Sequence, residues 1–251
     1  MLTTQRKQHL LDVLRRDGQI VAKQISQALG VSEDTIRRDL RELAQEGLLQ
    51  RVHGGALPAS PAVADFAGRE AILADAKTAI GRAAAALIKS GQVVILDGGT
   101  TALQIARHLP PTLDATIVTH SARIAVELVT HPRVEVILIG GRLFKHSIVS
   151  VGAAAIEAIS HIRADLYFMG VTGIHPDAGL STGDLEEAYV KYALCKCAAD
   201  TLVLASQEKL GAASQYVIAP LSEVSGLIVE ASVEAERLQP YLDRGLSIIR
   251  A

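Results

Sequence analysis

"SEDTIRRDLRELAQEGLLQRVHGGA", residues 32–56, joins a capped amphipathic helix to a glycine-centred hairpin. Ser32 is a suitable N-cap, and the two acids after it lie in the first turn, where the helix dipole favours negative charge. The apolar positions recur at helical spacing and form one face: Ile36, Leu40 and Leu43. Gly47 ends this pattern, and "LLQRVHGGAL" then supplies two short extended pieces around a glycine pair. The stretch therefore predicts a helix followed by a β-hairpin.

Two other short helices are predicted before this one. Leu10, Val13 and Leu14 are spaced for one helix face, and "RDGQ" ends that helix. The second helix has its apolar residues at i, i+4, i+7 and i+8: Val21, Ile25, Ala28 and Leu29. "LGVS" is typical of a tight turn, with Gly30 available for a positive φ. A helix–turn–helix with a hairpin wing inserts one helix into the DNA major groove and lays the wing on the backbone or the minor groove.

Three arginines share the side of the third helix that lies opposite its apolar face: Arg37, Arg38 and Arg41. A solvated surface is the usual meaning of a charged helix face. Here the turn before the helix and the hairpin after it favour DNA contact instead. The candidate contacts with double-stranded DNA are Lys23, Ser32, Thr35, Arg37, Arg38, Arg41, Arg51 and His53. Asp39 is expected to pair with a nearby arginine, because an acid gains nothing from contact with phosphate.

The charge of the chain is distributed unevenly. The first 57 residues contain nine lysines and arginines against seven acids, whereas the rest of the chain has sixteen against twenty. The positive excess of the first part is slight. The prediction of DNA binding therefore depends on how the charges are arranged.

This part of the chain resembles the N-terminal winged helix of the DeoR family of bacterial repressors. The resemblance lies in the spacing of Arg6, Leu10 and Leu14, in the "TIRRDL" core (35–40), and in the pattern "L…G.L.R.HGGA" after it. It implies a transcriptional regulator that binds operator DNA. We expect a homo-oligomer, a dimer or higher, because two half-sites one helical turn apart need two recognition helices.

From about residue 69 the pattern changes to alternating strands and helices, after a predicted linker over 58–68. Seven apolar runs predict strands at 93–97, 116–120, 134–140, 166–170, 201–206, 226–231 and 246–250. Continuous apolar runs are typical of strands that are covered on both faces, so we expect a mostly parallel α/β sheet. The predicted domains are a winged helix-turn-helix domain (1–57) and an α/β domain (69–251).

Five of the predicted strands end in polar loops: "DGGTT", "THS", "GGRL", "GVTG" and "ASQEKLG". The carboxyl ends of parallel strands lie along one edge of a sheet, and ligands bind in the crevice there. One glycine after a strand is usually only a turn, but five such loops favour a ligand site. The candidate contacts are Asp97, Gly98, Gly99, Thr100, Thr101, Thr119, His120, Ser121, Gly140, Gly141, Gly170, Thr172, Gly173 and Lys209.

The first of these loops has the features of an anion site. Gly98 and Gly99 allow backbone amides to approach a phosphate, two threonine hydroxyls follow, and the next helix points its N-terminus at the site. Asp97 is expected to accept hydrogen bonds from sugar hydroxyls instead. Lys209 is expected to pair with the phosphate, the alternative being an ordinary surface lysine.

The same loops resemble the C-terminal sensor of the DeoR family, so the resemblance covers nearly the whole chain. It implies a fold similar to ribose-5-phosphate isomerase. It also implies a repressor of a carbohydrate-utilisation operon that a phosphorylated sugar or sugar derivative releases from its operator. Lys77, Glu187 and Lys191 are among the matching positions.

The chain departs from the family pattern at a few positions of these loops. His120 stands where the family commonly has asparagine, and it can replace the hydrogen bonds of that residue. Ser206 stands where aspartate is common, which leaves Lys209 less neutralised and favours an anionic ligand. Many members have an acid at the place of Thr172. These departures affect which effector is expected more than its class.

No catalytic or metal-binding constellation is recognisable in the sequence. The eight histidines are scattered. Glu187 and Lys191, four residues apart on a predicted helix, suggest a surface ion pair. Cys195 and Cys197 are expected to be packing residues, because their side chains point in different directions on a helix and no second pair completes a zinc site. We therefore expect no enzyme activity, no metal and no cofactor.

The chain has no apolar run near the ~20 residues that span a bilayer. Its N-terminus also lacks the uninterrupted apolar core of a signal peptide. These features predict a cytoplasmic protein with no membrane partner.

Two alternatives remain open at this point. The chain could be a sugar-phosphate isomerase or a CoA-transferase-like enzyme with an appended DNA-binding module, which requires a positioned base with an acid partner in the crevice. Alternatively, the DNA-binding role holds and the ligand is unphosphorylated or absent.

Overall fold

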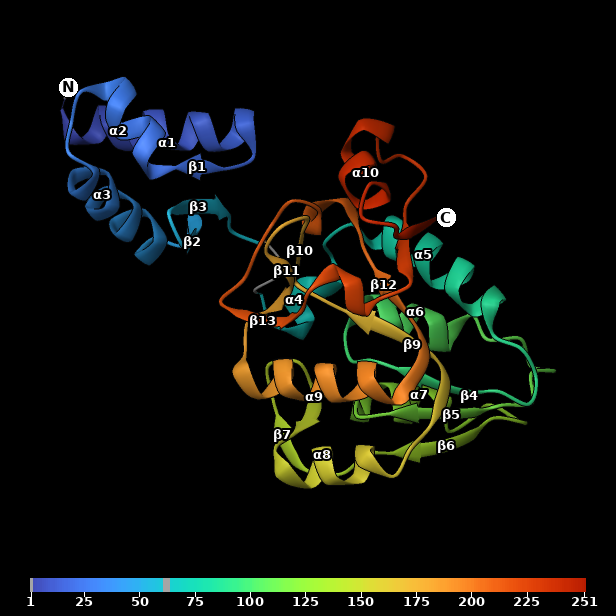
Figure 1. Cartoon of the computed structure of the whole chain (residues 1–251). Helices are drawn as coiled ribbons and strands as arrows, with labels where there is room; N and C mark the ends of the chain where they lie inside the picture. Colours follow the sequence, from blue (N-terminus) through green and yellow to red (C-terminus); the bar gives the residue numbers. More distant parts are fainter. Residues whose placement is uncertain (1, 61–63) are drawn as a thin grey trace.

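The structure is a computed structural model that describes residues 2–60 and 64–251. Its first part has three helices and a three-stranded antiparallel sheet, and Figure 1 shows this part set to one side of a larger α/β part. Its elements are α1 (Thr3–Asp17), β1 (Ile20–Val21), α2 (Ala22–Leu29), α3 (Glu33–Gln45), β2 (Leu49–Val52) and β3 (Gly55–Pro58).

The helices of this first part end and begin as their sequence requires. Gly18 and Gly30 end α1 and α2 in the left-handed conformation, with φ of 71° and 61°. Ser32 caps α3, because its hydroxyl accepts a hydrogen bond from the Thr35 amide at 3.1 Å. The apolar faces of the helices meet in one core. The three predicted helices and the predicted hairpin are thus confirmed.

Val21 is an exception to these predictions. The sequence predicted that Val21 lies on the apolar face of the second helix, but it lies in β1 and is exposed. Its backbone pairs with Gly55 of the hairpin. The two strands lie so close that a Cβ at position 55 would be 1.7 Å from the Ile20 carbonyl oxygen, which explains the second glycine of the hairpin.

Arg6 of α1 and Asp39 of α3 form a two-point ion pair inside this domain. Arg6 Nη2 lies 3.1 Å from Asp39 Oδ1, Arg6 Nε contacts the other oxygen, and both side chains are buried. The prediction that Asp39 pairs with an arginine is confirmed. The pair fixes α3 against α1 and so orients the outer face of α3.

The α/β part contains a seven-stranded sheet in which all neighbouring strands are parallel. Across the sheet the strands are β15 (Ser247–Arg250), β14 (Gly226–Val229), β12 (Ala198–Leu204), β9 (Ala164–Gly170), β4 (Val93–Leu96), β5 (Thr116–Thr119) and β6 (Glu135–Leu138). All seven predicted strands are therefore present in one sheet, and the predicted α/β class is confirmed.

Helices cover both faces of this sheet (Figure 1). One layer contains α4 (Phe66–Glu70), α5 (Ala74–Leu87), α6 (Thr100–Arg107) and α7 (Ala122–Leu128), and the other contains α8 (Ala153–Ser160), α9 (Leu185–Cys197) and α10 (Ala235–Leu242). Successive strand residues alternate between the two cores, as Val94 and Ile95 do. Cys195 and Cys197 are buried, unbridged packing residues, as predicted.

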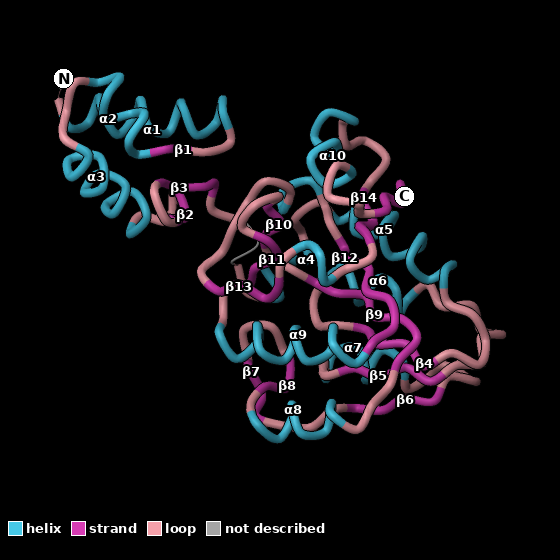
Figure 2. The backbone as a smooth tube through the Cα atoms, viewed as in Figure 1, coloured by secondary structure: helices cyan, strands magenta, loops and turns pink. Residues whose placement is uncertain are grey.

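Among the described residues, two small sheets and two short 3₁₀ turns complete the domain and were not predicted (Figure 2). They are the hairpin β7 (Arg142–Phe144) and β8 (Val149–Val151), the sheet β10 (Gly173–His175), β11 (Gly179–Thr182) and β13 (Tyr216–Ala219), and the turns η2 (Gln207–Lys209) and η3 (Leu221–Glu223). The β7–β8 hairpin covers the carboxyl end of β5, because the Ser150 amide donates to the His120 carbonyl at 2.7 Å.

The chain after β3 packs against the α/β part. The Pro58 carbonyl accepts a hydrogen bond from the Ala213 amide at 3.1 Å, and Ser60 donates to the Thr172 carbonyl. The predicted linker is therefore packed at both of these positions, while its residues 61–63 lie outside the described residues. None of the described helices is both long and apolar enough to cross a membrane.

Candidate functional sites

A cleft opens at the carboxyl ends of β4 and β9, the two neighbouring strands at which the strand order reverses. The chain runs from β4 to β5 and β6 in one direction, and from β9 to β12, β14 and β15 in the other. Open α/β sheets bind their ligands at such a reversal. The cleft measures about 510 Å³, including space open to solvent.

The loop between β4 and α6 forms one wall of this cleft. Gly99 is the N-cap of α6 and has a φ of 119°, a conformation that side chains rarely adopt. Thr100 and Thr101 follow in the first turn and line the cleft. The amides of a first helical turn have no partner within the helix, so here they are available to a bound anion together with the two hydroxyls.

Four cationic side chains line the cleft: Arg69 of α4, Lys77 of α5, Lys191 of α9 and Lys209 of η2. The three lysines are 5% exposed or less. Lys77 Nζ donates to the Arg69 carbonyl, and Lys209 Nζ donates to the Leu204 carbonyl at 3.2 Å. Within residues 2–60 and 64–251, neither ammonium has a carboxylate oxygen within 4.0 Å. Buried charges are normally paired, whereas here Glu208 acts on both ammonium groups through its charge and without a direct contact.

Burial lowers the pKa values of three of these cations. The pKa of Lys209 is lowered to about 8, mainly by burial and also by the nearby charges of Lys77 and Arg69, against the opposing effect of Glu208. Burial also lowers the pKa of Lys77 and of Arg69. An anion in the cleft would stabilise the charged forms.

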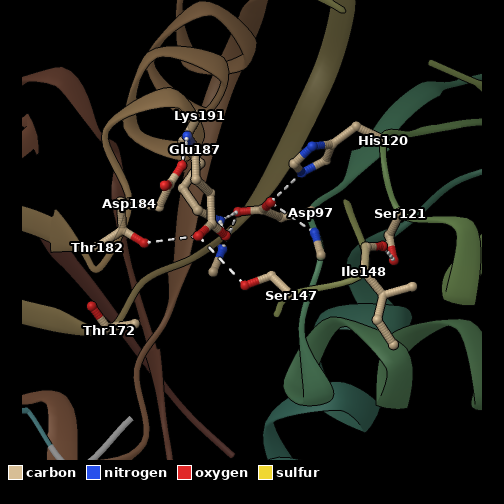
Figure 3. A network of polar contacts seen from close by, with 12 residues as sticks. Asp97, His120, Ser121, Ser147, Ile148, Thr172, Thr182, Asp184, Glu187 and Lys191 are labelled. Carbon is tan, nitrogen blue, oxygen red and sulfur yellow. Dashed lines mark hydrogen bonds and ion pairs between the residues drawn. The ribbon is translucent and has the colours of Figure 1, made fainter. Parts of the chain in front are cut away.

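Asp97 lies behind the cleft, and its buried carboxylate accepts hydrogen bonds from groups of the protein itself (Figure 3). Its oxygens accept five hydrogen bonds, from Lys191 Nζ (2.6 Å), the Gly98 and Gly170 amides and His120 Nε2 (2.7 Å each), and the Tyr167 hydroxyl (2.9 Å). Burial alone would raise the pKa of Asp97, but the Lys191 charge and the His120 hydrogen bond hold it well below its usual value. The expectation that Asp97 accepts hydrogen bonds from sugar hydroxyls is therefore not supported.

His120 also serves this buried cluster. Its Nε2 faces Asp97, its Nδ1 lies 3.0 Å from the Ser150 carbonyl oxygen, and the side chain is fully buried. Both ring nitrogens are therefore engaged within the protein. His120 thus positions Asp97 and does not line the cleft.

Glu187 and Lys191 form a buried ion pair at the cleft instead of the surface pair that their spacing suggested. Lys191 Nζ lies 3.4 Å from Glu187 Oε1, and the two residues are 2% and 6% exposed. The other oxygen of Glu187 accepts hydrogen bonds from Thr182 at 3.2 Å and Ser147 at 3.5 Å (Figure 3). The prediction was wrong because this side of α9 packs against the sheet.

Half of the predicted ligand contacts line the cleft: Gly98, Gly99, Thr100, Thr101, Gly170, Thr172 and Lys209. The other half do not: Asp97, Thr119, His120, Ser121, Gly140, Gly141 and Gly173. The strand order explains most of these misses, because β5 and β6 lie on the side of β4 away from β9 and the β7–β8 hairpin covers the end of β5. Gly173 packs against the Ala212 backbone. We do not propose these seven as effector contacts.

Several lining residues were not predicted as contacts: Arg69, Lys77, Thr182, Glu187, Lys191 and Glu208. Three of them, Lys77, Glu187 and Lys191, had a signal in the sequence, since they match the family pattern. Arg69 and Glu208 had none.

The eight candidate DNA contacts lie at the surface of α2, α3 and the hairpin. Arg37, Arg38 and Arg41 are exposed along α3, opposite the buried Ile36, Leu40 and Leu43. Arg37 is held by Glu33 at 2.7 Å. The hairpin presents Arg51 and His53 beside α3, with Gly54 at its tip in the left-handed conformation. The arrangement has the shape that a helix–turn–helix with a wing offers to DNA.

The chain matches two family models, "DeoR-like helix-turn-helix domain" over residues 6–61 and "DeoR C terminal sensor domain" over residues 73–231. HTH-type transcriptional regulator GlpR of Haloferax volcanii is 34% identical over 99% of this chain and 98% of its own length. HTH-type transcriptional repressor GlcR of Bacillus subtilis is 35% identical over 88% of this chain and 86% of its own. The glycerol-3-phosphate regulon repressor of Escherichia coli is 28% identical over 99% of both.

Among solved structures, ribose 5-phosphate isomerase A of Methanocaldococcus jannaschii covers 58% of this chain and 55% of its own, at 16% identity and a TM-score of 0.40. This likeness is too weak to bear on function.

Proposed function

The chain belongs to the DeoR family of transcriptional regulators, and we propose that a phosphorylated sugar or sugar derivative bound in the cleft releases it from the operator of a carbohydrate-utilisation operon. The relatives that it matches from end to end are named regulators and repressors, so the chain is a transcriptional repressor and not an enzyme. The observation that supports the proposed effector is that Lys77 and Lys209 are buried beside the N-terminus of α6 with, among the described residues, no carboxylate oxygen in direct contact with either ammonium.

The cleft contains the kinds of group that bind phosphate in proteins, namely backbone amides, hydroxyls and lysines. The amides and hydroxyls of Thr100 and Thr101 would donate to its oxygens, and Lys209 and Lys77 would supply charge. The name of the Escherichia coli relative refers to glycerol 3-phosphate, a polyol phosphate, which supports this ligand class.

For the DNA, we propose that α3 enters the major groove. Arg37, Arg38 and Arg41 would contact bases and phosphates there, with Ser32 and Thr35 at the helix start and Lys23 on a phosphate. Arg51 and His53 would lie against the backbone or the minor groove. One chain carries one recognition helix, so we propose at least a dimer, which sedimentation of the pure protein tests.

The contacts of Pro58 and Ser60 suggest how ligand binding in the cleft could affect the DNA-binding domain. Ser60 donates to the carbonyl of Thr172, and Thr172 lines the cleft. Pro58, the last residue of β3, is bonded to Ala213. A ligand that moves Thr172 would therefore displace the base of the wing. Such coupling needs only ~1–3 kcal/mol.

Thermal denaturation with paired ligands tests the effector class. We expect glycerol 3-phosphate, glucose 6-phosphate or fructose 1-phosphate to stabilise the α/β domain, by about 2.7 kcal/mol at 100 times the dissociation constant. Glycerol, glucose and fructose serve as controls and are expected to have no effect. Stabilisation by free sugars without any by their phosphates would reject a phosphorylated effector.

The affinity for the phosphorylated ligand is expected to fall as the pH rises above 8. A bound phosphate favours charged Lys209, whose pKa is lowered to about 8, so binding takes up a proton above that pH. Phosphate itself is fully ionised by then, since its second pKa is about 6. One proton corresponds to a loss of up to about tenfold per pH unit.

Calorimetry at pH 7, 8 and 9 measures this loss. Lys209→Arg keeps its charge throughout, so its affinity should stay nearly constant over the same range. An equal loss in both proteins would assign the titration to another group.

A further inference from the structure

Glu208 is the one carboxylate lining the cleft that, within the described residues, has an oxygen without a hydrogen-bond partner. Its Oε1 accepts a hydrogen bond from the Ser206 hydroxyl at 2.7 Å. Its Oε2 is buried and accepts none. Glu187, the other lining carboxylate, already accepts hydrogen bonds from Thr182 and Ser147 and pairs with Lys191.

Such an oxygen is unusual in a folded protein. Buried polar atoms almost always have a partner, so an oxygen of this kind is open to a hydrogen-bond donor from water or from a bound group. Leaving a buried acceptor unsatisfied is unfavourable, and more so when it carries charge. The oxygen is therefore a ready acceptor for a ligand in the cleft.

The chemistry of a carboxylate limits what this ligand group can be. An ionised carboxylate only accepts hydrogen bonds, so the group must be a donor. Lys77 and Lys209 lie close enough for their charges to act on Glu208, and a further cation would be repelled by them. A neutral hydroxyl satisfies both conditions, whereas a phosphate oxygen would be repelled by Glu208.

We propose that Glu208 binds a hydroxyl group of the effector and selects hydroxylated phosphates over bare phosphate and over alkyl phosphates. This role rests on the proposed function, because it assumes that the neighbouring lysines hold the phosphate. Glu208 thereby takes the hydroxyl-binding part that the sequence had suggested for Asp97.

Calorimetry with inorganic phosphate, propyl phosphate and glycerol 3-phosphate tests this role in the full chain. Glu208→Gln removes the charge and keeps the shape. In Glu208→Ala, which removes both acceptor oxygens, the preference for glycerol 3-phosphate over propyl phosphate is expected to fall by about tenfold or more, as expected for a lost hydrogen bond to a charged group. Glu208→Gln keeps one neutral acceptor oxygen, so its preference should fall less. Affinity for inorganic phosphate should stay the same or rise, because a negative charge has been removed beside the anion.

Glu230→Gln is the matched control. Glu230 has the second buried oxygen without a partner, but it does not line the cleft, so its substitution should leave the preference unchanged. Glu208→Ala gives a second variant, and circular dichroism checks that both are folded. An unchanged preference in both Glu208 variants would overturn the role of Glu208 while leaving the proposed function intact. Failure of the native protein to bind any of the three phosphates would instead reject the proposed function, and this role with it.

Discussion

Asp97→Ala is expected to destabilise the α/β domain by about 3–5 kcal/mol, the usual result of removing one partner from a buried charged pair. The substitution leaves Lys191 without its closest counter-charge and removes the acceptor that serves Tyr167 and His120. It also frees the Gly98 and Gly170 amides, which shape the wall of the cleft. Urea denaturation, followed by circular dichroism, measures the change in the free energy of unfolding.

Asp114→Ala provides the control for this experiment. Asp114 pairs with Arg133 at 3.0 Å, but both side chains are more than half exposed. Exposed pairs contribute about 0–1 kcal/mol, so this variant should resemble the native protein. A loss below 1 kcal/mol for Asp97→Ala would show that the buried cluster does not hold the domain together.

The double substitution Arg37→Ala and Arg38→Ala is expected to weaken operator binding by about 100-fold or more. Both side chains are exposed on the outer face of α3, which the buried pair of Arg6 and Asp39 orients. A good base contact contributes about 1–3 kcal/mol, so two lost contacts account for a change of this size. Gel shift on the promoter region beside the gene measures it at a fixed salt concentration.

Arg15→Ala with Arg16→Ala is the matched control, because it removes the same charge from the same domain. These two side chains are exposed in the last turn of α1 and are not among the candidate DNA contacts. The control should therefore bind much as the native protein does. Binding of the Arg37 and Arg38 variant within threefold of the control would contradict the assignment of α3 as the recognition helix.

The sequence predicted the DNA-binding domain well because its signals are local. The cap at Ser32, the apolar spacing of α3 and the glycine hairpin each act over a few residues, and each was found in the structure. Strands buried on both faces are also visible as continuous apolar runs, so all seven strands of the large sheet were predicted.

The cleft was predicted only in part because strand order is not a local property. The carboxyl ends of β4 and β9 are neighbours although more than seventy residues separate them in the sequence. The end of β5 is covered by the β7–β8 hairpin, for which the sequence contained no recognisable motif. The helical spacing of Glu187 and Lys191 indicated an ion pair but not the side of α9 that would be buried. Likewise, the position of Asp97 before two glycines did not indicate that its carboxylate would accept five hydrogen bonds from the protein.

Release of operator DNA by ligand is the most direct test of the central claim that the cleft is the effector site of a repressor. Fluorescence anisotropy of a labelled operator is measured with the native protein and with Thr100→Val, while the phosphorylated ligand that stabilises the protein is titrated in. Thr100 lines the cleft at the start of α6, which lies far from α3 in Figure 1, and valine keeps its shape without the hydroxyl.

Both proteins are expected to bind the operator equally without ligand. In the native protein the ligand should weaken operator binding by about 5–150-fold, in line with a coupling of ~1–3 kcal/mol. Thr100→Val should need about tenfold more ligand for the same release, since it lacks one hydrogen bond to a charged group. Release at the same ligand concentration in both proteins, or operator binding that no phosphorylated sugar weakens, would contradict the claim.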